Sequence, residues 1–95
     1  MTLHVVAEFR AATGQEDRLR TALEAMIEPS LSEAGCLAYQ PYVDPNDAAH
    51  MVVVEEWTSE AALDEHFATA HFAHVAEVLE RILAEPLVLR KLVAA

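Results

Sequence analysis

A short apolar run at residues 51–54 constrains the fold of this chain more than any other feature. Met51-Val52-Val53-Val54 is mostly β-branched, which is typical of a central β-strand. Ser59 follows a few residues later and precedes good helix formers, so its hydroxyl can cap the N-terminus of a helix. The sequence therefore predicts a strand over His50 to Trp57 that turns directly into a helix beginning near Ser59.

Glu55 lies close to the end of this predicted strand. Because strand side chains alternate between two faces, Glu55 shares a face with Val53 and Trp57. A carboxyl group among apolar neighbours loses the hydration of its charged form, which raises its pKa toward neutrality and makes it a candidate acid or base. Two alternatives stay open: a bulge turns Glu55 to the surface, or Arg90 or Lys91 pairs with it as a structural ion pair.

Composition limits the partners and the location that we expect. The 95 residues are 54% hydrophobic, which predicts a single domain over residues 1–95. Sixteen acidic and six basic residues give a net charge of -10, so neither nucleic acid nor a membrane surface is an expected partner. No basic region followed by an apolar core and no apolar segment of bilayer length is visible in the sequence, so we expect a soluble protein that is not exported. The single cysteine, Cys36, cannot form an internal disulfide, which favours a cytoplasmic location and a core-filling role.

Periodicity and turn residues predict the other elements. Leu3 to Arg10 alternates as a half-buried strand. A helix follows to about residue 34, with Pro29 interrupting its last turns and Gly35 ending it in the left-handed conformation. Cys36 to Val43 forms a second strand, which a turn at residues 44–47 connects to the strand over residues 50–57.

The C-terminal half completes the pattern. The helix that begins near Ser59 is predicted to break around residues 67–69, where Thr69 caps a second segment that ends before Pro86. Leu87 to Val93 forms the last strand. The β-α-β-β-α-β order predicts an α+β, ferredoxin-like protomer, with a four-stranded antiparallel sheet and both helices on one face. The other face still carries valines such as Val54, so we expect a homodimer packed sheet to sheet.

Several short motifs follow one another in a characteristic order. They are Gly35-Cys36-Leu37-Ala38-Tyr39, Asp44-Pro45, Glu55-Glu56-Trp57, Ala61, His66 and His71-Phe72. In this order they resemble the antibiotic biosynthesis monooxygenase family over nearly the whole chain. The resemblance implies a dimeric α+β barrel and a relation to cofactor-independent quinol and polyketide oxygenases. It is weaker for the substrate, because one scaffold hosts several chemistries.

The residues help to choose among these chemistries. Heme breakdown in related proteins uses an asparagine on the first strand, and residues 4–9 contain none. A phosphorylated ligand needs clustered cations, but the six basic residues are spread along the chain. An aromatic quinol suits an apolar pocket lined by Trp57, Tyr39 and Phe67. We therefore expect a cofactor-independent monooxygenase that uses dioxygen on a small aromatic quinol or polyketide phenol.

The resemblance also implies roles for individual side chains. Glu55 or His66 removes the phenolic proton while the other orients the base. His71 or Tyr39 hydrogen-bonds the oxygen on which negative charge persists. Trp57 stacks on the substrate ring, with plain core packing as the alternative. No flavin, metal or other cofactor is expected in this mechanism.

Other functions stay open at the level of sequence. The side chains of His66, His71 and His74 with Glu55 are possible ligands of zinc or iron, but they match no established metal motif, so no metal is expected. The chain also fits a non-enzymatic dimer that binds a small ligand. A third alternative is an isomerase or degradation enzyme for a small signalling metabolite.

Overall fold

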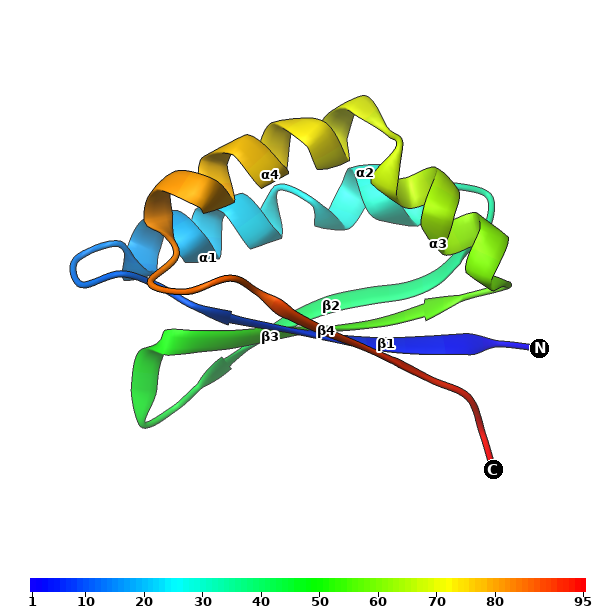
Figure 1. Cartoon of the computed structure of the whole chain (residues 1–95), viewed down its shortest axis with the longest axis horizontal. Coiled ribbons are helices and arrows are strands. Elements are labelled where there is room, and N and C mark those ends of the chain that lie inside the picture. The colour runs from blue at the N-terminus through cyan, green and yellow to red at the C-terminus, as the bar shows by residue number, and fades with distance from the viewer.

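Four strands form one antiparallel sheet in the order β2-β3-β1-β4 in the computed structural model, which describes residues 1–95 (Figure 1). The strands are β1 (Leu3–Arg10), β2 (Cys36–Asp44), β3 (Asp47–Trp57) and β4 (Val88–Leu92). The central position of β1 and β3 confirms the prediction. Strand β3 begins three residues earlier than predicted, because Asp44 already pairs with Asp47 across a tight turn.

The helices are α1 (Glu16–Glu24), α2 (Ile27–Leu31), α3 (Glu60–Phe67) and α4 (Ala70–Ile82). All four helices lie on the same side of the sheet, with α4 next to α1 and α3 near the end of β3 (Figure 1). The chain therefore has the predicted α+β, ferredoxin-like fold. No helix combines the length and the hydropathy needed to cross a membrane.

The first predicted helix is split into α1 and α2. The break falls at Ala25 and Met26, upstream of Pro29, and α2 ends at Leu31 rather than near residue 34. Proline has no N–H for a bond to the carbonyl four residues earlier, and its ring clashes with that carbonyl. A helix continued through Pro29 would meet both problems at Ala25. The interruption therefore lies one turn before the proline, which occupies the first turn of α2 instead.

Gly35 does not adopt the left-handed conformation that the sequence suggested. Gly14, with φ of 84°, is the only residue with positive φ. Gly35 is required for a different reason, because a Cβ atom there would overlap the Cβ of Ala62 and lie 3.0 Å from Oγ1 of Thr58. The absence of a side chain therefore lets the segment before β2 pack closely against the start of α3.

The break between α3 and α4 confirms the prediction. Ser59 caps α3 by accepting a hydrogen bond from the amide of Ala62 at 3.1 Å. Thr69 caps α4 in the same way, by accepting from the amide of Phe72 at 3.2 Å. This double cap places His66 in the last turn of α3 and the next predicted histidine at the beginning of α4.

The inner face of the sheet forms the core under the helices. Its buried side chains include those that alternate along β1 and β3: Leu3, Val5, Ala7, Phe9, Met51, Val53, Glu55 and Trp57. In the strand register Glu55 lies opposite Val5 of β1 and Tyr39 of β2. Glu55 therefore sits in the middle of the sheet and not at its edge.

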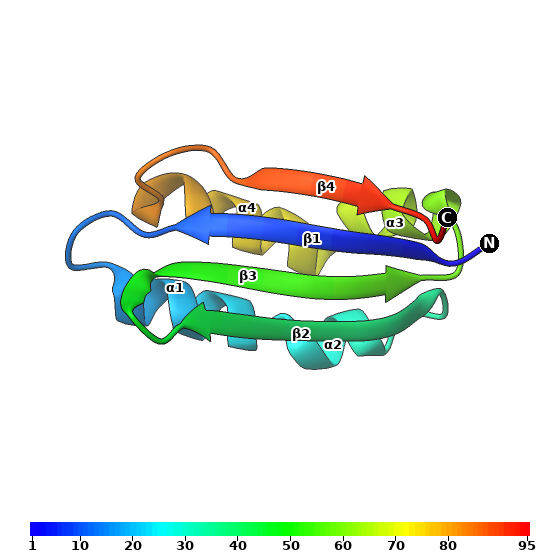
Figure 2. The ribbon, with the colours of Figure 1, turned by 90° about the horizontal axis from the view of Figure 1, so that it is seen from below.

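The outer face of the sheet carries no helix (Figure 2). Its register places Tyr42 and Val54, together with Val88 and Leu92 of β4, on this side. Their exposed fractions range from 39% for Val54 to 55% for Tyr42. These apolar side chains have no cover within the chain.

Candidate functional site

A cavity of about 350 Å³ lies between the sheet and the helices. Eleven of its thirteen lining residues are hydrophobic, with Tyr39 counted among them. The other two are Glu55 and His66. The full lining is Ala7, Phe9, Leu23, Met26, Tyr39, Glu55, His66, Phe67, Phe72, Val75, Leu79, Leu87 and Leu89. Pockets of roughly 300–1,000 Å³ with few polar groups are typical of sites for small molecules.

Glu55 projects from β3 into the wall of this cavity and is only 5% exposed. The pKa of its carboxyl group is raised to about 7, because the effect of burial outweighs the opposing hydrogen bond from Trp57 and the nearby charge of Glu33 adds to the rise. This confirms the expected perturbation. The alternative ion pair is wrong, because Lys91 bonds Glu60 at 3.0 Å and Arg90 pairs with Val6 on the outer face.

Trp57 lies behind the cavity wall. Its side chain is fully buried, and it does not line the cavity. Its indole Nε1 donates a hydrogen bond to Oε1 of Glu55 at 2.9 Å, and its ring lies 4.6 Å from the ring of His66, measured between centroids. Trp57 therefore contacts both polar groups of the site from the side away from the cavity.

His66 occupies an aromatic enclosure at the end of α3. It is 2% exposed, and Tyr39, Trp57, Phe67 and Phe72 surround its ring at centroid distances of 4.6 to 6.1 Å. Three of these rings, those of Tyr39, Phe67 and Phe72, also line the cavity. The imidazole is thus held in a fixed orientation at the wall of an apolar space.

Glu33 completes the site, and the sequence analysis did not identify it. It lies between α2 and β2, and its Oε2 is 2.7 Å from Nδ1 of His66 and 2.7 Å from Nε2 of His71. An ionised carboxylate can only accept hydrogen bonds, so both imidazole nitrogens donate to it. Glu33 is 33 and 38 residues away from these histidines in sequence, and no local pattern marks the contact.

The partner that orients His66 therefore differs from the expectation. Glu33 binds His66, whereas Glu55 is bound by Trp57. His71 also differs from its predicted place, because it contacts Glu33 and lines an outer groove instead of the cavity. Tyr39 and Phe67 do line the cavity.

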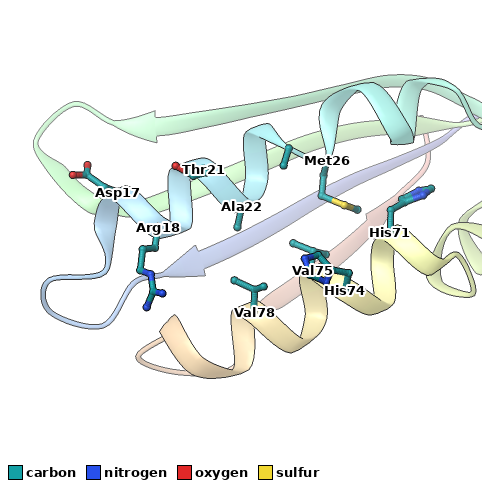
Figure 3. A pocket seen from close by; sticks show the side chains of 10 residues that line it. Asp17, Arg18, Thr21, Ala22, Met26, His71, His74, Val75 and Val78 are labelled. Atoms are coloured by element: carbon teal, nitrogen blue, oxygen red, sulfur yellow. The ribbon is translucent and has the colours of Figure 1, made fainter.

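The outer groove runs between α1 and α4 and has a volume of about 470 Å³ (Figure 3). His71 and His74 project from α4 into it, and Asp17 and Arg18 lie toward its other end (Figure 3). Its lining is Asp17, Arg18, Thr21, Ala22, Ala25, Met26, His71, His74, Val75 and Val78. Met26 and Val75 line both this groove and the inner cavity, so only side chains separate the two spaces.

Glu33, His66 and His71 also have the donor types that transition metals prefer. Their donor atoms lie within 4.8 Å of one another. Oxygen-to-nitrogen distances of 2.7 Å are those of charge-assisted hydrogen bonds. Two ligands about 2.1 Å from one ion would stand roughly 3.0–3.4 Å apart, so the arrangement fits hydrogen bonds better than a bound ion. The predicted set with Glu55 and His74 does not come together at this cluster.

Two further groups near the cavity hold their protons firmly. Burial and the charge of Glu55 raise the pKa of the Tyr39 phenol well above its usual value. Burial, aided by the charges of Glu33 and Glu55, raises the pKa of the Cys36 thiol to about 11. Tyr39 is thus a hydrogen-bond donor at neutral pH, and Cys36 is a poor nucleophile.

Comparison with known proteins defines the class. The sequence profile of the family described as antibiotic biosynthesis monooxygenase matches residues 2–78. The chain belongs to this family. It is also 37% identical over 84 residues to "Putative monooxygenase Rv0793" of Mycobacterium tuberculosis, with 84% of this chain and 82% of that protein covered. The structure of Rv0793 matches with a TM-score of 0.93 at 28% identity, covering 100% of this chain and 96% of that chain.

Two other relatives are similar to most of this chain. "Probable quinol monooxygenase YgiN" of Escherichia coli K12 is 33% identical over 88 residues, with 82% of this chain and 85% of that protein covered. "Uncharacterized protein sll1783" of Synechocystis is 32% identical over 82 residues. That match covers 86% of this chain but only 56% of the Synechocystis protein. The chain therefore spans little more than half the length of this relative.

Proposed function

We propose that this protein is a cofactor-independent monooxygenase that oxidises a small, uncharged aromatic quinol or polyketide phenol with dioxygen in the inner cavity. The observation that carries the proposal is a buried carboxyl group with a pKa of about 7, at the wall of an apolar cavity that a buried imidazole also lines. No lysine or arginine lines the cavity, which favours an uncharged substrate. The name of the relative YgiN supports a quinol as the substrate class.

In this proposal the protein supplies a base and a dry space. Glu55 or His66 removes a phenolic proton, and the electron-rich anion transfers one electron to dioxygen. The aryloxyl radical and superoxide then combine through a new carbon–oxygen bond to give a peroxide anion, which takes the proton back from the base and becomes a hydroperoxide. The base next removes the proton from the same ring carbon as the O–O bond breaks, which leaves one oxygen atom on that carbon as the new carbonyl of a quinone product. The departing hydroxide takes this proton and leaves as water, so the substrate supplies all the electrons and no external reductant is needed.

The cavity walls provide the remaining contacts. Tyr39, Phe67 and Phe72 line the cavity, so in this proposal the phenol of Tyr39 donates a hydrogen bond to the anionic oxygen and the two phenylalanine rings stack on the substrate. His71 and Trp57 act in this proposal by way of their neighbours Glu33 and Glu55. The apolar lining keeps water away from reactive oxygen intermediates.

We also propose that the protein acts as a cytoplasmic homodimer. The uncovered apolar side chains of the outer sheet face, among them Val54 and Leu92, support a sheet-to-sheet contact between two copies. The single free cysteine is consistent with a reducing compartment.

Dioxygen consumption tests the activity. Metal-stripped protein is incubated with a panel of benzene and naphthalene quinols, and wild type is compared with Glu55→Gln and His66→Ala. Matched controls are Glu56→Gln, the half-buried neighbour on the outer face, and His74→Ala in the outer groove. We expect turnover that survives chelation, persists in both controls and falls at least a hundredfold in one or both site variants.

Two outcomes would contradict the proposal. Turnover that requires an added metal or flavin would exclude the cofactor-independent reaction. Tight binding of one aromatic compound without oxygen consumption would identify a binding protein instead.

A further inference from the structure

We propose that Glu33 is the positioning residue that makes His66 the base of the reaction, and that His71 controls how much of the Glu33 charge acts on His66. This inference rests on the proposed function, because it assigns the base that the reaction needs. It concerns a carboxylate outside the cavity lining, which contacts the site only through imidazole rings.

The hydrogen bond to Glu33 fixes which ring nitrogen of His66 carries the proton. Nδ1 of His66 donates to Oε2 of Glu33 at 2.7 Å, which leaves the lone pair of the neutral ring on Nε2. Nε2 of His66 makes no hydrogen bond within the protein. Oγ of Ser30 is the only fully buried side-chain polar atom without a partner, so Nε2, which also lacks one, is not fully buried. Since His66 lines the cavity, Nε2 is the atom that can accept a substrate proton.

His66 becomes positively charged when its Nε2 accepts the substrate proton. An imidazolium ion at a 2% exposed position needs a counter-charge close by. Glu33 provides it, as the acidic member of a catalytic triad does for its histidine without taking the proton itself. The ion pairs of Glu33 are with His66 and His71 alone, so no lysine or arginine neutralises the carboxylate.

His66 and His71 share the negative charge of Glu33. His71 donates to the same oxygen as His66, so part of the negative charge of Glu33 is already engaged before the reaction begins. Loss of His71 would leave the whole charge to His66 and would make it a stronger base. The other titratable groups near His66 and Glu33 are Tyr39 and Cys36, which keep their protons, and Glu55, which lines the cavity with His66.

The outer groove provides a matched control. The side chain of His71 is 29% exposed, so a substitution there does not open the core. His74 projects from the same helix into the same groove (Figure 3). The ion pairs of Glu33 are with His66 and His71 and do not include His74. His71→Leu and His74→Leu therefore make the same chemical change with and without loss of the contact to Glu33.

The first experiment does not depend on turnover. Long-range proton–nitrogen NMR at pH 8.5 shows which ring nitrogen of His66 carries the proton. We expect the Nδ1–H form in wild type and in His74→Leu, and a shift toward the Nε2–H form in Glu33→Ala. An Nε2–H form in wild type would overturn the inference, whether or not the protein oxidises quinols.

The second experiment uses the pH profile of kcat/KM for an accepted quinol, measured in a Glu55→Gln background so that only His66 forms the low-pH limb. Glu33→Gln should lower kcat about ten- to a hundredfold with little change in KM, and move this limb to lower pH. Glu33→Asp should restore part of the rate. His71→Leu should move the limb to higher pH, and His74→Leu should leave it in place.

Opposite shifts for Glu33→Gln and His71→Leu are the decisive result, because a merely structural defect would lower the rate without moving the limb in either direction. Equal shifts in His71→Leu and His74→Leu would overturn the role of His71. Loss of the limb in Glu55→Gln alone would make Glu55 the base and overturn the assignment to His66. If no quinol is oxidised by wild type, the proposed function fails, while the NMR result still decides the position of the proton.

Discussion

Nε1 of Trp57 donates a hydrogen bond to Oε1 of Glu55 at 2.9 Å, between two buried side chains on the same face of β3. Donation to a carboxylate favours its charged form, so this bond lowers the pKa of Glu55. Burial acts in the other direction and is the larger effect, which leaves the pKa at about 7. The tryptophan therefore keeps the carboxyl group within the range where it exchanges protons at neutral pH.

Replacing Trp57 with phenylalanine should raise the pKa of Glu55 further above 7. The substitution removes the donor but keeps an aromatic ring, so burial acts on Glu55 without the opposing hydrogen bond. Carbon-13 NMR of the Glu55 carboxyl group as a function of pH measures the change. An unaltered or lower pKa in Trp57→Phe would show that the indole does not stabilise the carboxylate.

The raised pKa of Glu55 should also make the folded protein less stable as the pH increases. The folded state keeps the proton up to about pH 7, whereas an unfolded glutamic acid releases it near 4.5. Between these values the folded state binds more protons, so this group's contribution to the free energy of unfolding falls with pH. The fall is on the order of 3 kcal/mol by pH 8.

Denaturant unfolding at pH 5 and pH 8 measures this dependence. Glu55→Gln has no proton to release and should lose less stability between the two pH values than wild type. Glu56→Gln serves as the control, because Glu56 lies on the outer face, half exposed beside His4. The same pH dependence in wild type and Glu55→Gln would contradict the burial of a neutral carboxyl group.

Local patterns in the sequence were sufficient for most of the fold. Alternation along residues 51–57 placed Glu55 on the buried face, and the hydroxyls of Ser59 and Thr69 located the starts of α3 and α4. Each of these inferences depends on neighbours within a few residues. The same kind of reasoning predicted an interruption at Pro29, one turn later than the observed break at Ala25 and Met26.

The candidate site was only partly predictable, because its key contact joins distant segments. In the sequence, Glu33 is one of sixteen acidic residues and no local pattern distinguishes it. It reaches His66 only because residues 33–36 pack closely against α3. For Trp57 the sequence left substrate stacking and plain core packing open, and its position on the inner face of β3 buries it fully in the core. Both features depend on three-dimensional packing that no single-sequence pattern encodes.

Replacing Gly35 with alanine should destabilise the protein by about 1–3 kcal/mol and impair the site. The new Cβ atom would overlap Ala62 and press on Thr58, so α3 must move away from the segment that carries Glu33. Denaturant unfolding measures the loss. Gly14→Ala is the contrasting variant, since a Cβ there meets nothing within 4 Å and costs only backbone strain at φ of 84°.

A double-mutant cycle identifies the cause of the Gly35 effect. If the overlap with Ala62 is responsible, adding Ala62→Gly to Gly35→Ala should recover more stability than the helix loses from the new glycine. Additive losses in the double variant would place the cause elsewhere.

Replacing Val54 with aspartate should convert the proposed homodimer into a folded monomer. Val54 lies in the middle of the outer face, between Gln40 of β2 and Val6 of β1, and is 39% exposed within one chain. A carboxylate buried there in a sheet-to-sheet contact would lose its hydration without a partner, which costs several kcal/mol per copy. Sedimentation velocity at micromolar concentrations measures the change in mass.

Ala73→Asp is the matched control for this variant, because it adds the same charge to an exposed position on the helical side, in α4. It should remain dimeric, and circular dichroism should show an unchanged fold in both variants. The inner cavity lies on the opposite side of the sheet from Val54, so a folded monomer can still bind a quinol. A wild-type protein that sediments as a monomer, or a Val54→Asp variant that stays dimeric, would show that this face is not the contact between two copies.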